Sequence, residues 1–468
     1  MAGLTRPGRR GGVARFLAGL AAIALLLMTL YVGLGRVEML RAPAKGAAMT
    51  FPADFAFGTA TAAQQVEGGN TNNDYYQWEQ QGRTPPAGAA DDEYHRYDED
   101  LAIAASLGQN AFRLSIEWSR IEPSQGVFSD AEVAHYVAVL TSAHAHGLRT
   151  FVTLHHFTNP IWAADQGGWA NSAMPSWFAD YVAYVVPRVG RLVDYWLTVN
   201  EPNGEAFTSY LAGATPPGET DVVAMGTVLA NFLKAHAAAY HLIHDSFPDA
   251  KVSFADHFRV LDPARWWNPA DRLMADVLSD FWNDQLLDSI ASGRIRLFVP
   301  TLLDHEEDWP SLKGTLDFIG ANYYTRNLVR FDPSAPQRFT LEVAPEAPTT
   351  VRGTEIYPAG LYRVLLSLRR FHLPVLITEN GIDDPADSQR AAFICDHLAA
   401  VGAAMAEGAD VRGYLYWSLI DNYEWTSGFG PKYGLVAVDL ATQARTIRPS
   451  AQVFATIART RSLAPCGR

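Results

Sequence analysis

The sequence predicts an α/β protein whose main body is a (β/α)8 barrel, and three observations support this fold class. From residue 51 onwards, eight strand-like runs alternate with helix-like segments. The units show no internal sequence repeat. Polar or aromatic residues finish nearly every strand, as expected where strand ends surround one site. A doubly wound sheet is the alternative, and it is disfavoured because it would gather those residues along a single crevice.

The first 50 residues differ in kind from the rest. A basic segment, 1–15, precedes an uncharged apolar run of twenty residues, 16–35, and 36–50 is expected to be a linker. Twenty apolar residues are enough to cross a bilayer and exceed the roughly 7–15 of a cleavable signal. A single transmembrane anchor with its basic end on the cytoplasmic side is therefore favoured. A cleaved signal segment stays open, because Ala42-Pro43-Ala44 resembles a cleavage site.

The expected barrel domain is 51–468, and it should lie outside the cytoplasm. It would be membrane-anchored, or secreted if the N-terminal segment is cleaved. Runs rich in β-branched and aromatic residues predict its strands at 55–61, 111–118, 149–157, 195–202, 251–258, 316–324, 373–380 and 411–419. Helical patterns lie between and after them at 97–108, 130–147, 175–190, 225–246, 272–290, 359–371, 387–408 and 449–459. Long polar loops at 70–90, 212–221 and 331–358 could shape a pocket.

Two of the predicted strands end on a carboxylate at matching positions. Glu201 follows the buried-looking run 195–199, and Glu379 closes the run 373–379. Burying one carboxylate at a strand end is costly unless it is paired or functional, so two suggest a pair. Paired carboxylates with opposed roles are what glycosidic bond cleavage needs, about 5–5.5 Å apart in a retaining enzyme. A structural ion pair is the alternative for each.

Composition and motifs exclude several other functions. A formal net charge of -13 argues against nucleic-acid binding, and neither a Walker pattern nor G-x-G-x-x-G occurs. The histidines lack paired metal-ligand spacing, so no metal and no cofactor is expected. Cys395 and Cys466 form no recognisable disulfide framework, and both are expected to be incidental. Twelve Trp and nineteen Tyr suit sugar binding, although a large aromatic core explains most of them.

Several motifs identify a resemblance that spans about residues 51–460. They are FGTATAAQQVEG, LSIEWSRIEP, TLHHF, TVNEP, ANYYTR, ITENG, YWSLIDNYEW and FGPKYGLVAVD. Taken together and in this order, they resemble glycoside hydrolase family 1, the β-glucosidase family. The resemblance implies a retaining β-glycosidase, β-glucosidase- or β-galactosidase-like, that hydrolyses O-linked β-glycosides by double displacement.

The resemblance also implies roles for individual residues. Glu201 matches the general acid/base and Glu379 the nucleophile. Support for the nucleophile and the transition state falls to Arg113, Tyr324 and Asn322. Substrate binding falls to Gln65, His156, Asn200, Trp417, Glu424, Trp425 and Tyr433. Asn200 would reach the 2-hydroxyl, and Trp417 would lie under the sugar ring.

Some strand-end residues have a structural alternative or no assigned role. Arg113 and Tyr324 could instead hold the barrel mouth together. Glu67, Glu117 and His155 are expected either to support the site residues from behind or to pack, and no role is assigned to Asp256 and His257. Departures from the family pattern bear on sugar and aglycone preference, at Gln64, Thr158, Asn159 and Tyr433.

Other segments point to one branch of the family. WAADQGGW, AGLYRVLLSL and GFGPKYGLVAVDLATQARTIR are similar to the membrane-anchored branch that includes the Sensitive-to-Freezing type galactolipid galactosyltransferases. The first alternative function is therefore a membrane-associated transglycosylase that moves a glycosyl group between glycolipid headgroups. The second is a non-catalytic sugar-binding protein, which would require a lost carboxylate. The expected partners are a β-glycoside, a glycolipid under the first alternative, and the membrane through the N-terminal helix.

Overall fold

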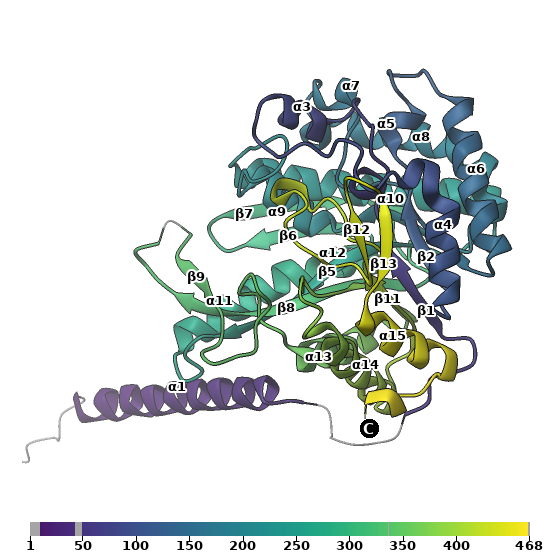
Figure 1. The fold of residues 1–468 in the computed structure, drawn as a ribbon. Helices are drawn as coiled ribbons and strands as arrows, with labels where there is room; N and C mark the ends of the chain where they lie inside the picture. Colours follow the sequence, from purple (N-terminus) through teal and green to yellow (C-terminus); the bar gives the residue numbers. More distant parts are fainter. Residues whose placement is uncertain (1–9, 43–48, 336, 467–468) are drawn as a thin grey trace, which may run out of the picture.

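The computed structural model of the chain describes residues 10–42, 49–335 and 337–466 (Figure 1). Residues 1–9 of the expected basic segment lie outside the described residues, as does 43–48, which contains part of the expected linker and Pro43 and Ala44 of the cleavage-like site. The described part confirms a (β/α)8 barrel preceded by one long apolar helix.

Eight parallel strands close the barrel. They are β1 (Ala56–Ala60), β2 (Ala111–Ser115), β3 (Arg149–Thr153), β4 (Tyr195–Asn200), β5 (Val252–Pro263), β8 (Ile319–Phe331), β10 (Val375–Asn380) and β11 (Val411–Trp417). The order β10-β11-β1-β2-β3-β4-β5-β8 is closed by a further pairing of β10 with β8. Every predicted strand is present. Their apolar runs form strands because both faces are covered, by the barrel interior and by the surrounding helices.

A layer of side chains fills the barrel interior. One residue from each strand or its edge contributes, and the layer consists of Ala56, Ala111, Phe151, Leu197, Ala255, Phe318, Leu376 and Leu415. Alanines beside larger side chains let the layer pack without a central pore. Room for a ligand is therefore expected beyond this layer, where the strands end on polar residues.

The outer ring of helices follows the predicted alternation. It comprises α4 (Glu93–Ser106), α6 (Asp130–Ala145), α8 (Met174–Val189), α10 (Val222–Ser246), α11 (Pro269–Ser279), α12 (Gln285–Ser292), α13 (Pro358–Leu368), α14 (Arg390–Ala406) and α15 (Pro449–Thr460). The expected helix 272–290 is instead two helices, because a π-helical segment, Asp280–Asp284, separates α11 from α12. Shorter helices lie in the loops, namely α2 (Ala63–Val66), α3 (Asp74–Gln80), α5 (Trp118–Ile121), α7 (Ile161–Ala164) and α9 (Pro202–Tyr210).

Five further strands were not expected from the sequence. β6 (Arg294–Val299) and β7 (Leu303–Asp308) form a hairpin, β9 (Phe339–Glu342) adds antiparallel to β8, and β12 (Val436–Asp439) pairs with β13 (Ala444–Ile447). In the β6–β7 hairpin, Arg294 is paired with Asp308 and Arg296 with Glu306. Opposite charges across the ladder support these exposed strands, and they lack the long apolar runs that mark the barrel strands.

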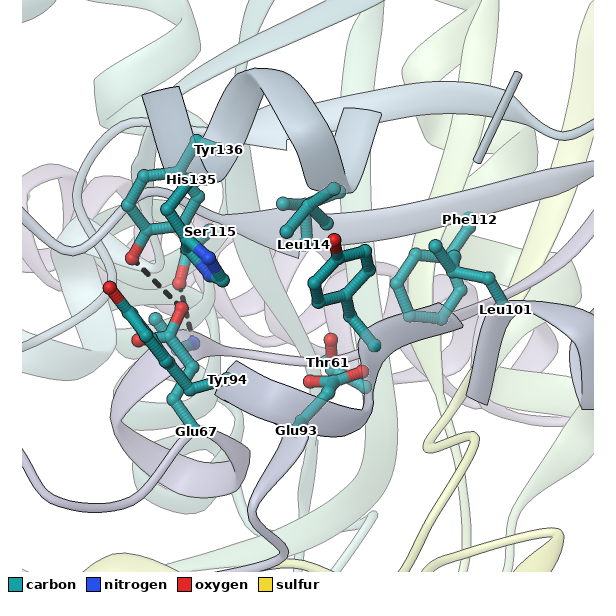
Figure 2. A pocket seen from close by; sticks show the side chains of 13 residues that line it. Thr61, Glu67, Glu93, Tyr94, Leu101, Phe112, Leu114, Ser115, His135 and Tyr136 are labelled. Atoms are coloured by element: carbon teal, nitrogen blue, oxygen red, sulfur yellow. Dashed lines mark hydrogen bonds between the residues drawn. The ribbon is translucent and has the colours of Figure 1, made fainter. Parts of the chain in front are cut away.

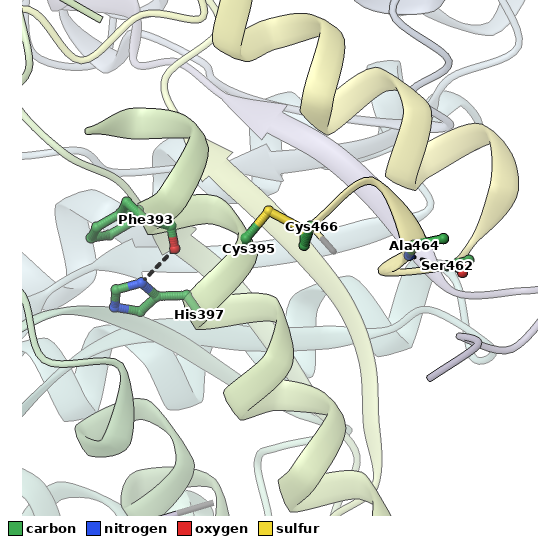
Figure 3. The surroundings of a disulfide bond; sticks show 6 residues. All are labelled: Phe393, Cys395, His397, Ser462, Ala464 and Cys466. Carbon is green, nitrogen blue, oxygen red and sulfur yellow. Dashed lines mark hydrogen bonds between the residues drawn. A yellow bond between two sulfur atoms is a disulfide. The ribbon is translucent and has the colours of Figure 1, made fainter. Parts of the chain in front are cut away.

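Cys395 and Cys466 are joined in a disulfide, so the expectation that both cysteines are incidental is wrong (Figure 3). Cys395 lies on α14, and Cys466 lies near the chain end, 71 residues later. Their spacing in the sequence could not predict the disulfide, because only the folded barrel brings the C-terminal segment back onto α14. The cross-link fixes that segment against the barrel.

The helix α1 (Arg10–Met39) extends beyond both ends of the expected span 16–35. Residues 19–30 are exposed, and contacts with the barrel begin at Tyr31. The Tyr31 hydroxyl donates to the Asp276 carboxylate of α11, and Glu38 pairs with Arg272 at 3.3 Å. Among the described residues, α1 and α10 are long and apolar enough to cross a membrane. Since α10 is mostly buried against its neighbours, it belongs to the barrel.

Candidate active site

Glu201 stands at the junction between β4 and α9. Its backbone is left-handed, with φ of 44°, and Pro202 begins the helix immediately after it. The Glu201 backbone N–H donates to the Ala255 carbonyl of β5 at 2.7 Å. This sharp turn ends the strand and leaves the side chain 9% exposed at the end of the barrel. A non-glycine residue held in this conformation marks a position where the surrounding fold compensates local strain.

Glu379 lies near the end of β10 and is also buried. Its Oε1 accepts a hydrogen bond from Arg113 Nη1 at 2.6 Å, and its Oε2 accepts one from the Tyr324 hydroxyl at 2.6 Å. The structure thus brings Arg113 and Tyr324 onto the two oxygens of one carboxylate. Charge-assisted hydrogen bonds of this kind favour the ionised carboxylate.

Arg113 is fully buried on β2 and uses its guanidinium to join four strands. Besides Glu379, it donates to the Asn200 Oδ1 at 2.6 Å, the Thr153 hydroxyl at 3.0 Å and the Thr378 carbonyl at 3.2 Å. A buried cation is tolerated only when it is paired and hydrogen-bonded in this way. Arg113 therefore both faces Glu379 and holds the mouth together, so the two sequence interpretations of this residue coexist.

Asn322, near the start of β8, contacts Glu201. Its Nδ2 donates to Glu201 Oε1 at 2.8 Å and to Asn200 Oδ1 at 3.1 Å, and its Oδ1 accepts from the Thr378 hydroxyl at 2.6 Å. Glu201, Asn322, Asn200, Arg113 and Glu379 thus form one continuous hydrogen-bonded chain. The two carboxyl groups belong to a single buried network.

The two carboxyl groups influence each other's protonation. Burial raises the pKa of Glu379 to about 7; Arg113 lowers it, and the charge of Glu201 raises it. Burial also raises the pKa of Glu201, but the positive form of His257 and the Asn322 N–H outweigh burial and leave that pKa below its usual range. A carboxyl pair in this arrangement shares protons as one unit.

Sequence analysis assigned no role to His257, which the structure places beside Glu201. Its Nδ1 lies 3.2 Å from Glu201 Oε2. The preceding residue, Asp256, is fully buried on the opposite face of β5, and burial raises its pKa well above the usual range. Successive side chains along a strand point to opposite faces. His257 therefore points into the barrel interior, as does Asn322, its partner on β8, whereas Asp256 points away. This alternation is the sequence signal that could have distinguished His257 from Asp256.

Aromatic rings form one wall next to the carboxylates. The His156 ring is nearly parallel to Trp417 at 5.9 Å and to Trp425 at 6.0 Å. Burial and the charge of Arg113 hold the pKa of His156 well below its usual range, so the imidazole is neutral. Its Nε2 lies 3.2 Å from Asn200 Nδ2, and its Nδ1 has no protein hydrogen-bond partner among the described residues. A neutral imidazole with a spare ring nitrogen suits a ligand hydroxyl.

Gln65, Glu424 and Tyr433 complete this side of the site. Gln65 donates to Asn422 Oδ1 and the Tyr423 carbonyl, while its own Oε1 is buried with no partner among the described residues. Glu424 accepts a hydrogen bond from Trp417 Nε1 at 3.1 Å, and burial raises the pKa of Glu424 to about 8. The Tyr433 ring lies 6.4 Å from Tyr324 and packs beside Trp417. Together these side chains offer open acceptors and donors next to apolar ring faces, as a sugar requires.

Comparison with known proteins decides the family. The model of Glycosyl hydrolase family 1 matches residues 47–463. The chain belongs to glycosyl hydrolase family 1. Beta-glucosidase A of Thermotoga maritima is 31% identical over 443 residues, which cover 88% of this chain and 98% of that protein. The solved structure of a β-glycosidase from Pyrococcus horikoshii is 37% identical with a TM-score of 0.83 and covers 89% of this chain and 96% of its own.

A third relative of this family 1 enzyme is named for a different activity. The galactolipid galactosyltransferase SFR2 of Arabidopsis thaliana is 32% identical over 385 residues. The match covers 77% of this chain and 57% of that protein. The family 1 barrel is therefore shared with both glycosidases and a glycosyltransferase.

A separate cavity lies outside the family 1 site, between β2 and the segment 61–67 on one side and α4 and α6 on the other (Figure 2). Glu67 accepts hydrogen bonds there from Tyr136 at 2.8 Å and from Arg120 at 2.8 Å. Phe112 and Leu114 line it, whereas Arg113 between them faces the barrel interior. The cavity thus belongs to the sheet–helix packing layer, in agreement with the packing alternative for Glu67.

Proposed function

We propose that this family 1 enzyme is a retaining β-glycosidase of β-glucosides or β-galactosides, with Glu379 as nucleophile and Glu201 as general acid/base. The observation that supports the assignment most strongly is the asymmetry of the carboxylate pair. Arg113 and Tyr324 donate to Glu379, which favours its ionised form. Arginine stays charged in proteins, whereas Glu201 contacts an imidazole and the Asn322 amide. The productive form carries the proton on Glu201.

In the first step, ionised Glu379 attacks the anomeric carbon while Glu201 gives its proton to the departing oxygen. The bond to the leaving group breaks as the glycosyl ester forms. Once Glu379 is an ester, its negative charge no longer opposes ionisation of Glu201. Glu201 then takes a proton from water, the water oxygen attacks the anomeric carbon, and Glu379 is released.

The remaining side chains would bind the sugar. In this proposal Trp417 lies under the ring, and Gln65, His156 and Glu424 bond its hydroxyls, because each offers an unused or weakly used polar atom. Asn200 binds the 2-hydroxyl, whose hydrogen bond strengthens in the transition state. Asn322 orients Glu201, and Trp425 and Tyr433 complete the walls of the sugar site.

The test supplies aryl β-glucoside and aryl β-galactoside and measures released phenol and free sugar together. Equal amounts are expected for hydrolysis. Glu379→Gln should abolish turnover. Glu201→Ala should be rescued by azide with formation of a β-glycosyl azide, because azide attacks the α-linked ester and needs no general base. Unchanged turnover in Glu379→Gln, or an α-glycosyl azide, would contradict the assignment.

A second candidate is transfer of the glycosyl group to a hydroxyl of another glycolipid. The similarity to the galactolipid galactosyltransferase SFR2 favours it, as does the apolar helix α1. It uses the same two carboxylates, and only the acceptor in the second step differs. Phenol released in clear excess over free sugar, in the presence of glycolipid vesicles, is the expected sign of transfer. The non-catalytic alternative loses its basis, because the family is enzymatic and both carboxylates are present.

We also propose that α1 anchors the enzyme and that the barrel domain, 51–468, lies outside the cytoplasm. The length of the apolar run supports a membrane span. The Cys395–Cys466 disulfide supports an oxidising compartment. Protease added to intact spheroplasts should degrade the barrel. Intact-mass measurement of the N-terminus distinguishes an anchor from a cleaved signal, since cleavage near Ala44 removes α1.

A further inference from the structure

Two neighbouring tryptophans are exposed where β5 leads into α11. Trp266 is 41% exposed and Trp267 is 60% exposed, and no other tryptophan among the described residues is in the exposed class. Leu273 of α11 is also exposed, as are Leu341 of β9 and Val343 just after it. We call these five residues the rim patch. Exposed apolar side chains that gather in one place mark an interaction surface.

Backbone hydrogen bonds and strand pairing join the parts of the rim patch. The Ala264 N–H donates to the Val329 carbonyl of β8 at 2.8 Å, and Val329 is paired with Leu341 across the β8–β9 ladder. Asp271 of α11 accepts from the Phe331 backbone N–H at 3.0 Å. The turn that bears the tryptophans, the start of α11 and the β8–β9 hairpin therefore form one continuous surface.

The rim patch adjoins the helix α1. The Arg36 guanidinium lies 4.0 Å over the Trp266 ring. Arg36 directly follows the uncharged run 16–35, so in a membrane-spanning α1 it marks the level of the lipid headgroups. Trp266 would then stand at the same level. Figure 1 shows α1 passing below α11, with β9 on the same side of the barrel.

We infer that the rim patch is a second membrane contact, which rests on the bilayer surface beside α1 and fixes the orientation of the barrel. This inference rests on the proposed anchoring by α1. Tryptophan favours the membrane–water interface because its ring is apolar and its N–H is polar. The partner is a lipid surface and not a second copy of the chain, because the patch continues the line at which α1 leaves the bilayer.

The contact depends on apolar and aromatic burial and not on lipid charge. Three arginines around the rim patch already have acidic partners: Arg265 with Asp271, Arg272 with Asp276, and Arg330 with Glu342. Arg36 stacks on Trp266. The patch therefore does not form a polybasic surface. Binding should therefore be the same on zwitterionic and anionic vesicles and insensitive to salt, unlike binding by a polybasic surface.

The rim patch also lies close to the active site. β5 carries His257 and β8 carries Tyr324, and both strands continue outward to the rim. Trp266 lies nine positions after His257, so the bilayer surface would lie at most about 30 Å from His257 along the strand. A glycoside whose aglycone is embedded in the bilayer would then be presented near the mouth.

The test uses the full chain reconstituted into phosphatidylcholine vesicles that contain lipids brominated on the acyl chains. Residues 1–77 contain no tryptophan, so quenching of tryptophan fluorescence reports on the barrel alone. Partial quenching is expected in the parent protein. Trp266→Phe with Trp267→Phe keeps an apolar surface and should lose most of the quenched signal. Trp177→Phe on α8 is the matched control and should leave it unchanged.

Flotation of the vesicles separates the possible failures. Protein that does not float with them contradicts anchoring by α1, and the rim contact with it. Protein that floats while the double variant keeps the quenched signal overturns the rim contact alone. Quenching that collapses in 1 M salt, or that requires anionic lipid, also overturns it, since paired arginines predict no such dependence. Turnover of a soluble aryl glycoside tests the proposed catalysis independently.

Discussion

The two carboxyl groups of the active site differ in the groups that contact them. Glu379 faces the Arg113 guanidinium, whereas Glu201 faces the His257 imidazole and the Asn322 amide. Burial raises the pKa of Glu201, and the contacts with His257 and Asn322 lower it. In the proposed productive form Glu201 holds the proton while Glu379 remains beside the guanidinium.

Replacement of Tyr324 by Phe removes one donor from Glu379. The Tyr324 hydroxyl lowers the pKa of Glu379, so its loss should raise that pKa further above about 7. The acidic limb of the kcat/KM profile should move to higher pH, and kcat/KM at pH 6 should fall roughly 10–100-fold, as for one hydrogen bond to a charged group. The pH profile on an aryl glycoside measures both. An unmoved acidic limb would contradict the assignment of Glu379 as nucleophile.

Replacement of Asn322 by Ala should move the opposite limb. The Asn322 N–H favours the ionised form of Glu201, so its loss should raise the pKa of Glu201. The basic limb should then move up by about one unit. Tyr324→Phe is the matched control, since it acts on the other carboxylate. A shift of the acidic limb in Asn322→Ala would instead indicate support of the nucleophile.

Sequence could locate the reactive residues better than their partners. Glu201 and Glu379 stand out because each interrupts an apolar run, and Arg113 stands out as a cation inside another. The sequence could not show which of the two carboxylates Asn322 contacts, because that depends on how β8 is shifted along the barrel axis relative to its neighbouring strands. His257 was missed for a related reason. Its neighbour Asp256 is equally polar, and only the strand's facing in the closed barrel separates them.

Among the helices and strands, those with long apolar runs could be predicted from the sequence, and the short ones could not. The barrel strands and ring helices were found because burial on two faces leaves an unmistakable pattern. The β6–β7 hairpin was missed because its strands are short and charged, and cross-strand ion pairs stabilise them. The break between α11 and α12 has no proline or glycine to mark it. The disulfide was missed because 71 residues separate its cysteines.

Loss of the disulfide should lower stability without changing the reaction. Cys466→Ser frees the C-terminal segment from α14, and a cross-link of this kind contributes roughly 2–4 kcal/mol to the free energy of unfolding. In a chain of this size that corresponds to a fall in Tm of about 2–5 °C. Calorimetry measures it. Reductant should lower the Tm of the parent protein by the same amount as the Cys466→Ser substitution does, and it should leave the Tm of Cys466→Ser unchanged. A Tm of the variant that falls with reductant would contradict this explanation.

At the scale of the whole molecule, the anchor, the rim patch and the active site follow one another along the same side of the barrel. α1 contacts α11 through Tyr31 and Glu38, and the turn before α11 bears the exposed tryptophans. β5 connects that turn to His257 in the active site. This arrangement gives the molecule a preferred pose on a bilayer. The rim patch should therefore affect turnover of substrates embedded in the membrane and leave turnover of substrates in solution unaffected.

Trp266→Ser combined with Trp267→Ser in the full chain should separate those two rates. Neither residue contacts the carboxylate network, so kcat/KM for a soluble aryl β-glycoside should stay within about twofold of the parent value. Turnover of a β-glycosyl diacylglycerol in vesicles should fall about tenfold. Two partly buried rings contribute roughly 1–2 kcal/mol to holding the mouth at the surface, and 1.4 kcal/mol corresponds to a factor of ten. Trp177→Ser on α8, outside the rim patch, is the control. Equal losses on both substrates would show damage to the fold, and equal retention would show that α1 alone positions the enzyme.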